Sequence, residues 1–483
     1  SKGIMYVDDR RVEFDGEKNV LSVIRKAGIS VPTFCYYSEL STYGACRMCV
    51  VETDRGTIEA SCSMEPKDGL RIYTNTQKTL RYRKMILELL LAAHCRDCTT
   101  CEKNGDCKLQ DYCFEYGVEK TSFPGEMNNA PIDDTNKFFT YDPSLCILCH
   151  RCVNTCKEIV GRGAIDTMNR GFQSVIGAHY KNTWNEGICE SCGNCVQACP
   201  TGALTMKRRK KYRPYQVEKK VLTTCPHCAT GCQYYVLVKD GKVVDTEAYD
   251  GPSNKGLLCV KGRSGSFDFA QSPERIKYPL IKNHETGEFE RATWDEALDL
   301  VASKFMEIKK QYGPDSLAGF ACSRSPNEDI YMVQKMVRTC FGTNNTDNCA
   351  RVCHSASVSG LAMSLGSGAM TNPIYDITHD VDAILLVGSN PEEAHPVVGA
   401  QIRQAVQNGT QLIVVDPRDI GLAKSAAVHL KLRPGTNVAF ANGMMNVFIN
   451  EGLIDEEFIK TRTEGFEELK KIVMEYTPER VAH

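Results

Sequence analysis

Cysteine is the residue type with the clearest chemistry in this chain, which holds 25 cysteines among 483 residues. Most of them stand two or three residues apart, a spacing that lets several thiolates converge on one metal centre. Disulfide frameworks of high cysteine content belong to short secreted chains, and this chain is long. Iron-sulfur clusters are therefore the expected use of these cysteines, with zinc as the competing interpretation.

The strongest signal is a run of four cysteines with the spacing C-x2-C-x2-C-x3-C, which occurs twice. In bacterial ferredoxins the fourth cysteine of each such run ligates the cluster of the other run. The second copy continues with the usual Pro200, whereas the first has Lys157 at that place. Two 4Fe-4S clusters are predicted, with the ligands Cys146, Cys149, Cys152, Cys156, Cys189, Cys192, Cys195 and Cys199.

Two further groups precede these runs. In the first, a close pair on a glycine-bearing loop is flanked by single cysteines, which suits a 2Fe-2S cluster although its spacing departs from that of plant-type ferredoxins. In the second, a histidine at the end of an apolar helix precedes three cysteines, which favours a 4Fe-4S cluster with one imidazole ligand. Cys95 and Cys113 are then left over and are expected to be buried small hydrophobes. The ligands are Cys35, Cys46, Cys49 and Cys62 for the first group, and His94, Cys98, Cys101 and Cys107 for the second.

A last group, TTCPHCATGC followed by GLLCVKG, predicts one more 4Fe-4S cluster. Its ligands are Cys225, Cys228, Cys232 and Cys259. One 2Fe-2S and four 4Fe-4S clusters in one chain form a wire, because each cluster holds one electron at a time. A centre that performs two-electron chemistry is therefore expected at one end.

The elements that must position these groups follow from the hydrophobic pattern. Residues 3–28 read as two short strands and an amphipathic helix, typical of a small α+β domain, and a helix over residues 79–93 leads into the second group. The basic run over residues 207–211 is expected to be a solvated linker. From Trp294, helical segments alternate with short apolar strands, which predicts an open parallel α/β sheet with ligands at the carboxyl ends of its strands.

Composition and charge exclude several classes of protein. The net charge of -2 gives no reason to expect a nucleic-acid partner. No apolar stretch is long enough to span a bilayer, and the pair Arg10 and Arg11 lacks the apolar run that an export signal needs. A cytoplasmic location is expected.

The order of the cluster motifs up to about residue 210 resembles the N-terminal part of iron-only hydrogenases and of the large peripheral subunit of NADH:quinone oxidoreductase. From Val221 the chain resembles the catalytic (alpha) subunit of anaerobic, cytoplasmic molybdopterin-dependent formate dehydrogenases. The segments TTCPHCATGC, GLLCVKGR, NCARVCHSASVSGL, VGSNPEEAHPV, VVDPRD and RTEGFEELKKIV follow one another in the family's order.

The second resemblance implies a molybdenum or tungsten ion held by two molybdopterin guanine dinucleotides. Cys353 matches the cysteine or selenocysteine metal ligand, and His354 matches the neighbouring active-site histidine. Lys261 matches the lysine between a cluster and one pterin. Loops at expected strand ends are candidates for holding a guanine dinucleotide. Their residues are Gly388, Ser389, Asn390, Asp416 and Arg418, together with Arg433, Gly435 and Thr436.

The implied function is reversible oxidation of formate to carbon dioxide, with electrons passing through the clusters to a partner. That partner is expected to be a flavin- and iron-sulfur-containing subunit linked to NAD(P) or ferredoxin, or a hydrogenase. The alternative is an electron-transfer subunit of a respiratory NADH dehydrogenase-type complex with a non-catalytic pterin site. The choice of metal, the electron acceptor, the direction and the oligomeric state stay open.

The expected fold is a multidomain α+β and α/β chain: ferredoxin-like iron-sulfur domains followed by part of a molybdopterin-oxidoreductase α/β fold. The C-terminal region is expected to be incomplete and to lack the family's substrate-binding arginine. The domains are a 2Fe-2S β-grasp domain (1–78), a helical 4Fe-4S domain with one histidine and three cysteine ligands (79–140), a two-cluster ferredoxin domain (141–213), a 4Fe-4S domain (214–275) and a pterin-binding α/β region (276–483).

Overall fold

The computed structural model describes residues 2–179, 183–265 and 267–483. The chain divides into two compact units, Ser1–Tyr375 and Asp376–His483. The architecture is mixed α and β, as expected, with small iron-sulfur-type domains first and a parallel α/β part at the end.

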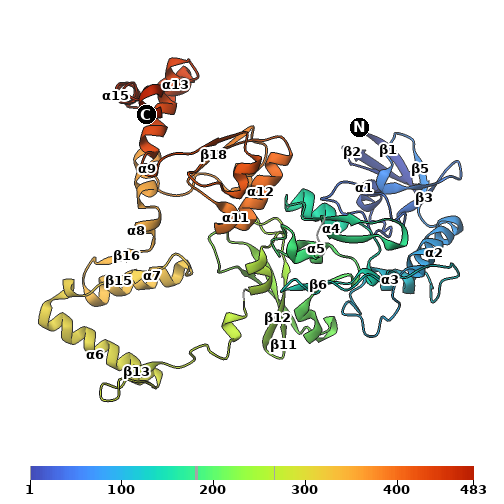
Figure 1. Cartoon of the computed structure of the whole chain (residues 1–483), viewed down its shortest axis with the longest axis horizontal. Helices are drawn as coiled ribbons and strands as arrows, with labels where there is room; N and C mark the ends of the chain where they lie inside the picture. Colours follow the sequence, from blue (N-terminus) through green and yellow to red (C-terminus); the bar gives the residue numbers. More distant parts are fainter. Residues whose placement is uncertain (1, 180–182, 266) are drawn as a thin grey trace. The chain divides into compact units, whose positions relative to one another are not determined.

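The N-terminal domain is a five-stranded sheet with one helix, in the strand order β2-β1-β5-β3-β4 (Figure 1). The two expected strands and the expected helix are present, and Asn19 caps the helix by accepting a hydrogen bond from Ser22 N at 3.0 Å. Apolar side chains of the helix and the sheet form one core with Cys49 and Cys62. The elements are β1 (Lys2–Val7), β2 (Arg10–Asp15), α1 (Val20–Lys26), β3 (Val50–Thr53), β4 (Ile58–Ala60) and β5 (Arg71–Tyr73).

Two helices follow, α2 (Gln77–Ala92) and α3 (Lys108–Glu115). Thr76 caps α2 by accepting a hydrogen bond from Thr79 N at 3.1 Å. Leu87 of α2 is fully buried, and it belongs to an apolar core that also contains Leu109 of α3. The helices therefore hold the segment with the second group of expected ligands against its neighbours.

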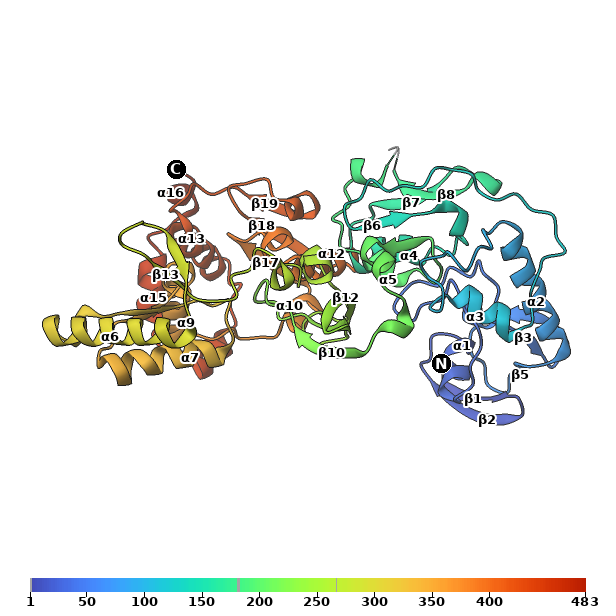
Figure 2. The ribbon, with the colours of Figure 1, turned by 90° about the horizontal axis from the view of Figure 1, so that it is seen from below.

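The two C-x2-C-x2-C-x3-C runs each lead into a short helix, α4 (Arg151–Asn154) and α5 (Asn194–Ala198), within one domain (Figure 2). Two small antiparallel sheets, β6-β9 and β7-β8, complete it around an apolar core. Trp184 of that core contacts Phe139 edge to face, with ring centroids 5.6 Å apart. The strands are β6 (Phe139–Tyr141), β7 (Ile165–Met168), β8 (Val175–Ala178) and β9 (Leu204–Met206).

An antiparallel three-stranded sheet follows, made of β10 (Lys219–Thr224), β11 (Gln233–Lys239) and β12 (Lys242–Ala248). The basic run Lys207–Lys211 before it is a short 3-10 helix and is not a solvated linker, so that expectation was wrong. The side chains of Arg208 and Arg209 are only 13% and 12% exposed, because each faces a carboxylate.

The rest of the first unit consists of helices and two-stranded sheets. A capping box starts its longest helix, α6, where the side chains of Thr293 and Glu296 accept hydrogen bonds from each other's backbone N–H. The elements are β13 (Leu280–Lys282), β14 (Phe289–Arg291), α6 (Trp294–Tyr312), β15 (Gly319–Ala321), α7 (Asn327–Met336), β16 (Thr346–Asn348), α8 (Ala350–Cys353), α9 (Ser355–Leu365) and, reaching into the second unit, α10 (Ile374–Thr378).

The second unit contains a parallel sheet in the order β17-β18-β19, labelled in Figure 2. Buried residues of α12 pack on it, and helices α13 to α16 follow. The sequence pattern predicted one parallel sheet that includes β15. Instead, β15 pairs in parallel with β16 and does not join the β17-β18-β19 sheet. The elements are β17 (Ala383–Val387), α11 (Pro391–Ala394), α12 (Pro396–Gln407), β18 (Gln411–Val415), β19 (Val428–Leu430), α13 (Asn437–Asn450), α14 (Glu456–Arg462), α15 (Phe466–Val473) and α16 (Pro478–Ala482).

Among the described helices, none combines the length and the apolar character that crossing a membrane requires.

Candidate functional site

The four cysteines of the N-terminal domain lie together in its interior. Cys35 Sγ donates a hydrogen bond to Cys46 Sγ at 3.3 Å, and this bond lowers the pKa of Cys46 to about 6. A hydrogen bond from Cys62 lowers the pKa of Cys49 to about 7. The same hydrogen bond, followed by burial and by the charges of Cys49, Cys35 and Cys46, raises the pKa of Cys62. The structure therefore brings the four expected 2Fe-2S ligands into one group.

The second group surrounds a cavity of about 150 Å³, and its four expected ligands, His94, Cys98, Cys101 and Cys107, all line that cavity. Nδ1 of His94 is buried there and has no hydrogen-bond partner among the residues that the structure describes. Burial also lowers the pKa of His94 to about 4, so the imidazole is neutral at pH 7, as a metal ligand must be. A donor set that converges on one cavity and includes a buried, unsatisfied nitrogen fits an iron-sulfur cluster.

Three further residues at this cavity were not predicted to line it, among them Cys95 and Cys113, which were expected to be buried but are half-buried. Cys95 and Cys113 line it as well, so they are not simply remote core residues. Gly202 also lines it, and a Cβ atom there would lie 2.7 Å from Cys101 Sγ. A glycine is needed because the sulfur approaches the backbone of the next domain so closely.

The two ferredoxin-like runs exchange their fourth cysteines. A small cavity is lined by Cys156 of the first run together with Cys189, Cys192 and Cys195 of the second. Conversely, the pKa of Cys152 is raised, first by burial and then by the charges of Cys149, Cys146 and Cys199. Cys156 thus lies with the first three cysteines of the second run, and Cys199 lies within electrostatic reach of Cys152 of the first run.

The last cysteine group begins with Cys225, directly after β10. Burial raises the pKa of Cys232 to about 12, and Cys225, Cys259 and Cys228 add to this effect, so all four lie within electrostatic reach. Cys225 N donates to Cys232 O at 2.9 Å, which closes the loop between them. Cys259, which is distant in sequence, therefore lies near Cys225, Cys228 and Cys232.

Burial raises the pKa of most of these thiols, for example to about 11 for Cys146 and to about 12 for Cys156. Such thiolates need a positive metal centre to ionise inside the protein. Within the described ranges, no three His, Cys, Asp or Glu side chains form a group that could hold a metal ion. In a 4Fe-4S cluster each of the four ligands binds a different iron atom, so these ligands stand farther apart than the ligands of one ion.

Three of the ligand groups are joined by direct packing. One apolar core contains Cys35 of the first group, Cys107 of the second and Cys149 of the ferredoxin-like domain. Backbone hydrogen bonds link the same parts, from Cys95 N to Ser144 O at 2.9 Å and from Lys108 N to Pro200 O at 3.0 Å. This arrangement suits electron transfer between neighbouring groups.

The residues implied by the second resemblance are distributed over both units. Cys353 is the last residue of α8, His354 connects α8 with α9, and both side chains are exposed. Lys261 starts a short π-helix, Lys261–Gly265, two residues after Cys259. All three belong to the first unit.

The expected nucleotide-binding loops lie together in the second unit. Gly388 and Asp416 directly follow β17 and β18, and because the strands are parallel and in register, their carboxyl ends share one edge. Asp416 is buried and accepts a hydrogen bond from Arg418 N at 2.8 Å. Oδ1 of Asn390 is buried and finds no hydrogen-bond partner within the described part of the chain, which fits a loop that receives a polar ligand. Ser389 stands between Gly388 and Asn390, and the turn Arg433, Gly435 and Thr436 lies between β19 and α13.

Family models account for most of the chain. A molybdopterin oxidoreductase model matches residues 275–474, and a molybdopterin oxidoreductase Fe4S4 domain matches residues 218–268. Upstream, the matches are a 2Fe-2S iron-sulfur cluster binding domain (4–77), the NADH-ubiquinone oxidoreductase-G iron-sulfur binding region (83–122) and the ferredoxin-like domain of NADH-quinone oxidoreductase subunit 3 (138–205).

Three relatives illustrate the similarity. The NADPH-Fe(3+) oxidoreductase subunit alpha of Geobacter sulfurreducens is 35% identical over 469 residues, which cover 96% of this chain and 54% of the relative. The F420-dependent formate dehydrogenase 2 subunit alpha of Methanococcus maripaludis is 49% identical over 265 residues, 55% of this chain and 38% of the relative. A putative formate dehydrogenase of Staphylococcus aureus is 32% identical over 507 residues, 95% of this chain and 50% of the relative.

The chain thus spans about half the length of the curated relatives that it matches over almost its whole length. The order of its domains is the same as the order of the matched family models. The C-terminal part of the chain thus matches molybdopterin oxidoreductase models, and its N-terminal part matches 2Fe-2S and 4Fe-4S domains of the NADH-quinone oxidoreductase type.

Proposed function

We propose that this chain is part of the catalytic subunit of a formate dehydrogenase, which interconverts formate and carbon dioxide. The observation that carries this proposal is the 49% identity to a formate dehydrogenase alpha subunit over 265 residues. That identity is much higher than the 35% shared with the relative named for another reaction. The activity belongs to the whole enzyme, of which this chain supplies about half the length of a subunit.

The proposed cofactors are one 2Fe-2S cluster, four 4Fe-4S clusters and molybdenum or tungsten with two molybdopterin guanine dinucleotides. The cluster ligands are those named from the sequence, and their grouping in the interior supports the assignment. Cys353 is the proposed protein ligand of the metal, and the loops after β17, β18 and β19 are the proposed nucleotide contacts.

The metal centre, when bound, supplies two-electron oxidation of a one-carbon acid. The thiolate of Cys353 is a soft donor, which suits a high-valent metal with sulfur ligands. The imidazole of His354 stands next to it in the chain and is exposed, so it can take up the proton released when formate becomes carbon dioxide. Lys261 lies two residues after Cys259 and is proposed to connect the adjacent cluster with one pterin.

Electrons are proposed to leave through the Cys225 group and to pass along the two-cluster domain to the His94 group and the 2Fe-2S group. The shared apolar core and the backbone hydrogen bonds support the part of this route that leads from the two-cluster domain to the His94 and 2Fe-2S groups. The electron acceptor is proposed to be a flavin- and iron-sulfur-containing partner subunit that uses NAD(P) or ferredoxin.

One observation favours a second function. The relative that matches 96% of this chain is named for NADPH and Fe(3+), without reference to formate. In that case the clusters would carry electrons between a nicotinamide-linked partner and another acceptor, and formate would not be a substrate.

The experiment that separates the two uses the full-length enzyme purified without oxygen. Its metal and pterin content is measured together with formate-dependent reduction of a viologen dye, in the parent and in Cys353→Ala. Cys340→Ala is the matched control, because Cys340 is an exposed cysteine of the same unit without a proposed role. We expect molybdenum or tungsten in the parent and loss of formate activity only in Cys353→Ala. Iron without either metal, or undiminished activity in Cys353→Ala, would contradict formate dehydrogenase chemistry at this site.

A further inference from the structure

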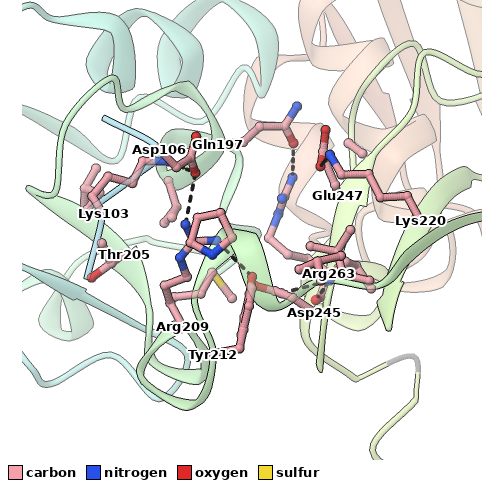
Figure 3. A pocket seen from close by; sticks show the side chains of 18 of the residues that line it. Lys103, Asp106, Gln197, Thr205, Arg209, Tyr212, Lys220, Asp245, Glu247 and Arg263 are labelled. Carbon is pink, nitrogen blue, oxygen red and sulfur yellow. Dashed lines mark hydrogen bonds and ion pairs between the residues drawn. The ribbon is translucent and has the colours of Figure 1, made fainter. Parts of the chain in front are cut away.

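Arg263 is a buried cation that neither the cluster motifs nor the pterin site uses. Its side chain is 4% exposed, and it follows Cys259 by four residues. It borders a cavity of about 440 Å³ between the two-cluster domain and the domain of β10 to β12 (Figure 3). Burying a guanidinium is costly unless it is paired and hydrogen-bonded, so its partners indicate its role.

The hydrogen bonds of Arg263 reach ligand segments of two different groups. Its backbone N–H donates to the carbonyl of Cys259 at 3.0 Å. Its side-chain Nε donates to the carbonyl of Cys192 at 2.8 Å. One residue thus connects a ligand of the Cys225 group with a ligand of the Cys156/Cys189/Cys192/Cys195 group by two hydrogen bonds.

The rest of the guanidinium is fixed by the helix that follows the Cys192 loop. Nη2 donates to Asn194 Oδ1 at 3.0 Å and to Gln197 Oε1 at 2.7 Å. The side chain of Asn194 in turn makes two hydrogen bonds with the backbone of Leu258. Its Nδ2 donates to the carbonyl oxygen at 2.9 Å, and its Oδ1 accepts from the backbone N–H at 3.3 Å. The contact is therefore a fixed network between the two segments.

The loop itself is shaped to receive this side chain. Gly193 has φ +70, and a Cβ atom there would lie 2.3 Å from Cδ of Arg263 and 2.9 Å from Nε. Only glycine leaves room for the arginine at this point and adopts the left-handed conformation without strain. The guanidinium also lowers the pKa of Cys192, against the larger raising effect of burial, so its charge acts on the ligand thiolate.

We propose that Arg263 is a positioning residue that fixes these two clusters relative to each other. It provides the hydrogen-bonded connection between their ligands. Its charge also raises the reduction potential of the cluster held by Cys156, Cys189, Cys192 and Cys195. A positive charge beside the cluster stabilises its reduced, more negative state and so raises its reduction potential. The inference rests on the cluster ligands proposed above and does not depend on formate as the substrate.

The test is a dithionite titration of the full-length enzyme, followed by electron paramagnetic resonance. The two cluster signals are assigned by their loss in Cys189→Ala and in Cys228→Ala. Arg263→Gln removes the charge, and Arg263→Lys keeps the charge but not the forked set of donors. Arg209→Gln is the control, because Arg209 borders the same cavity and pairs with Asp106 at 3.2 Å.

We expect the midpoint potential of the Cys189-dependent signal to become more negative in Arg263→Gln and to stay near the parent value in Arg263→Lys and Arg209→Gln. Electron equilibration between the two clusters, followed after flash photoreduction, should slow by about tenfold or more in both Arg263 variants, within the range known for outer-shell partners. If Arg263→Gln does not fold, Gln197→Ala, which removes one acceptor of the guanidinium, should slow the equilibration in the same direction.

Unchanged potential and unchanged equilibration in variants that retain both signals would overturn the inference while leaving the proposed clusters intact. Absence of a Cys189-dependent signal in the parent enzyme would overturn the proposed ligand set and this inference with it. Formate activity is measured separately and decides neither result.

Discussion

Both the sequence and the structure support a role of His94 as a cluster ligand. Its position before three cysteines suggested a ligand, and its buried, unpartnered Nδ1 in the same cavity as those cysteines supports that role. The cavity also contains Cys95 and Cys113, which are alternative thiolate donors. Single substitutions can therefore determine which of these side chains ligate the cluster.

We expect His94→Ala to lose or convert one 4Fe-4S signal, because the cluster loses a ligand at a buried position. Cys113→Ala should retain it, since the cavity keeps its three other expected thiol ligands and the imidazole. Iron content and electron paramagnetic resonance of the anaerobic protein measure both outcomes. Retention in His94→Ala combined with loss in Cys113→Ala would indicate four thiolate ligands instead.

Residue spacing predicted most of the candidate ligands because ligands of one cluster are close in sequence. The spacing could not predict Gly202 or Arg263, because their roles arise from contacts between segments far apart in the chain. Gly202 approaches Cys101 from the following domain, and Arg263 reaches the carbonyl of Cys192 from 71 positions further along the chain. No local pattern marks such pairs.

At the scale of elements, the short helix Lys207–Lys211 joins the two-cluster domain to β12. Arg208 Nε lies 3.9 Å from Asp245 Oδ1, and the two side chains are only 13% and 9% exposed. Tyr212 donates a hydrogen bond to the same carboxylate at 2.6 Å. The basic run was interpreted as a linker because five cations in sequence usually face solvent, whereas here three of them pair with acidic residues of other segments.

Asp245→Ala should destabilise this contact by about 3 to 5 kcal/mol, because it leaves Arg208 as a buried charge without its carboxylate. Lys207→Ala is the control: the ion pair of Lys207 with Asp134 spans 3.0 Å, but its side chains are 32% and 61% exposed. Such a pair contributes at most about 1 kcal/mol. Thermal unfolding and limited proteolysis before residue 219 measure the stability of both variants. Equal destabilisation by Asp245→Ala and Lys207→Ala would contradict a stabilising buried ion pair at Asp245.

At the scale of the whole molecule, the two small α/β features expected as one sheet are separate. The strands β15 and β16 pair within the first unit, and β17 to β19 pair within the second. The strand pattern predicts that strands are parallel, but it contains no information on which strands are neighbours, since that depends on contacts distant in sequence. In the N-terminal domain, β1, β2 and α1 were predicted because they are consecutive in the chain, whereas β3, β4 and β5 of the same sheet were not.

The iron-sulfur part of the molecule depends on a common core. Leu87 is fully buried in the core that contains Cys35, Cys107 and Cys149, which belong to three different groups. Leu21 is equally buried, but its core contains only Cys49 and Cys62 of the first group. The two leucines are therefore a matched pair for asking whether the clusters are held jointly or one by one.

Either leucine-to-alanine change should cost about 2 to 5 kcal/mol through lost burial and the cavity left behind. We expect Leu87→Ala to weaken the signals of the 2Fe-2S cluster, the His94 cluster and the Cys149 cluster together on mild heating. Leu21→Ala should affect the 2Fe-2S signal alone, because its core touches no other ligand group among the described residues. Spin quantification after graded heating measures this difference. Loss of only one signal in Leu87→Ala would mean that each cluster domain holds its own cofactor, and that the shared core serves packing without coupling the stability of the clusters.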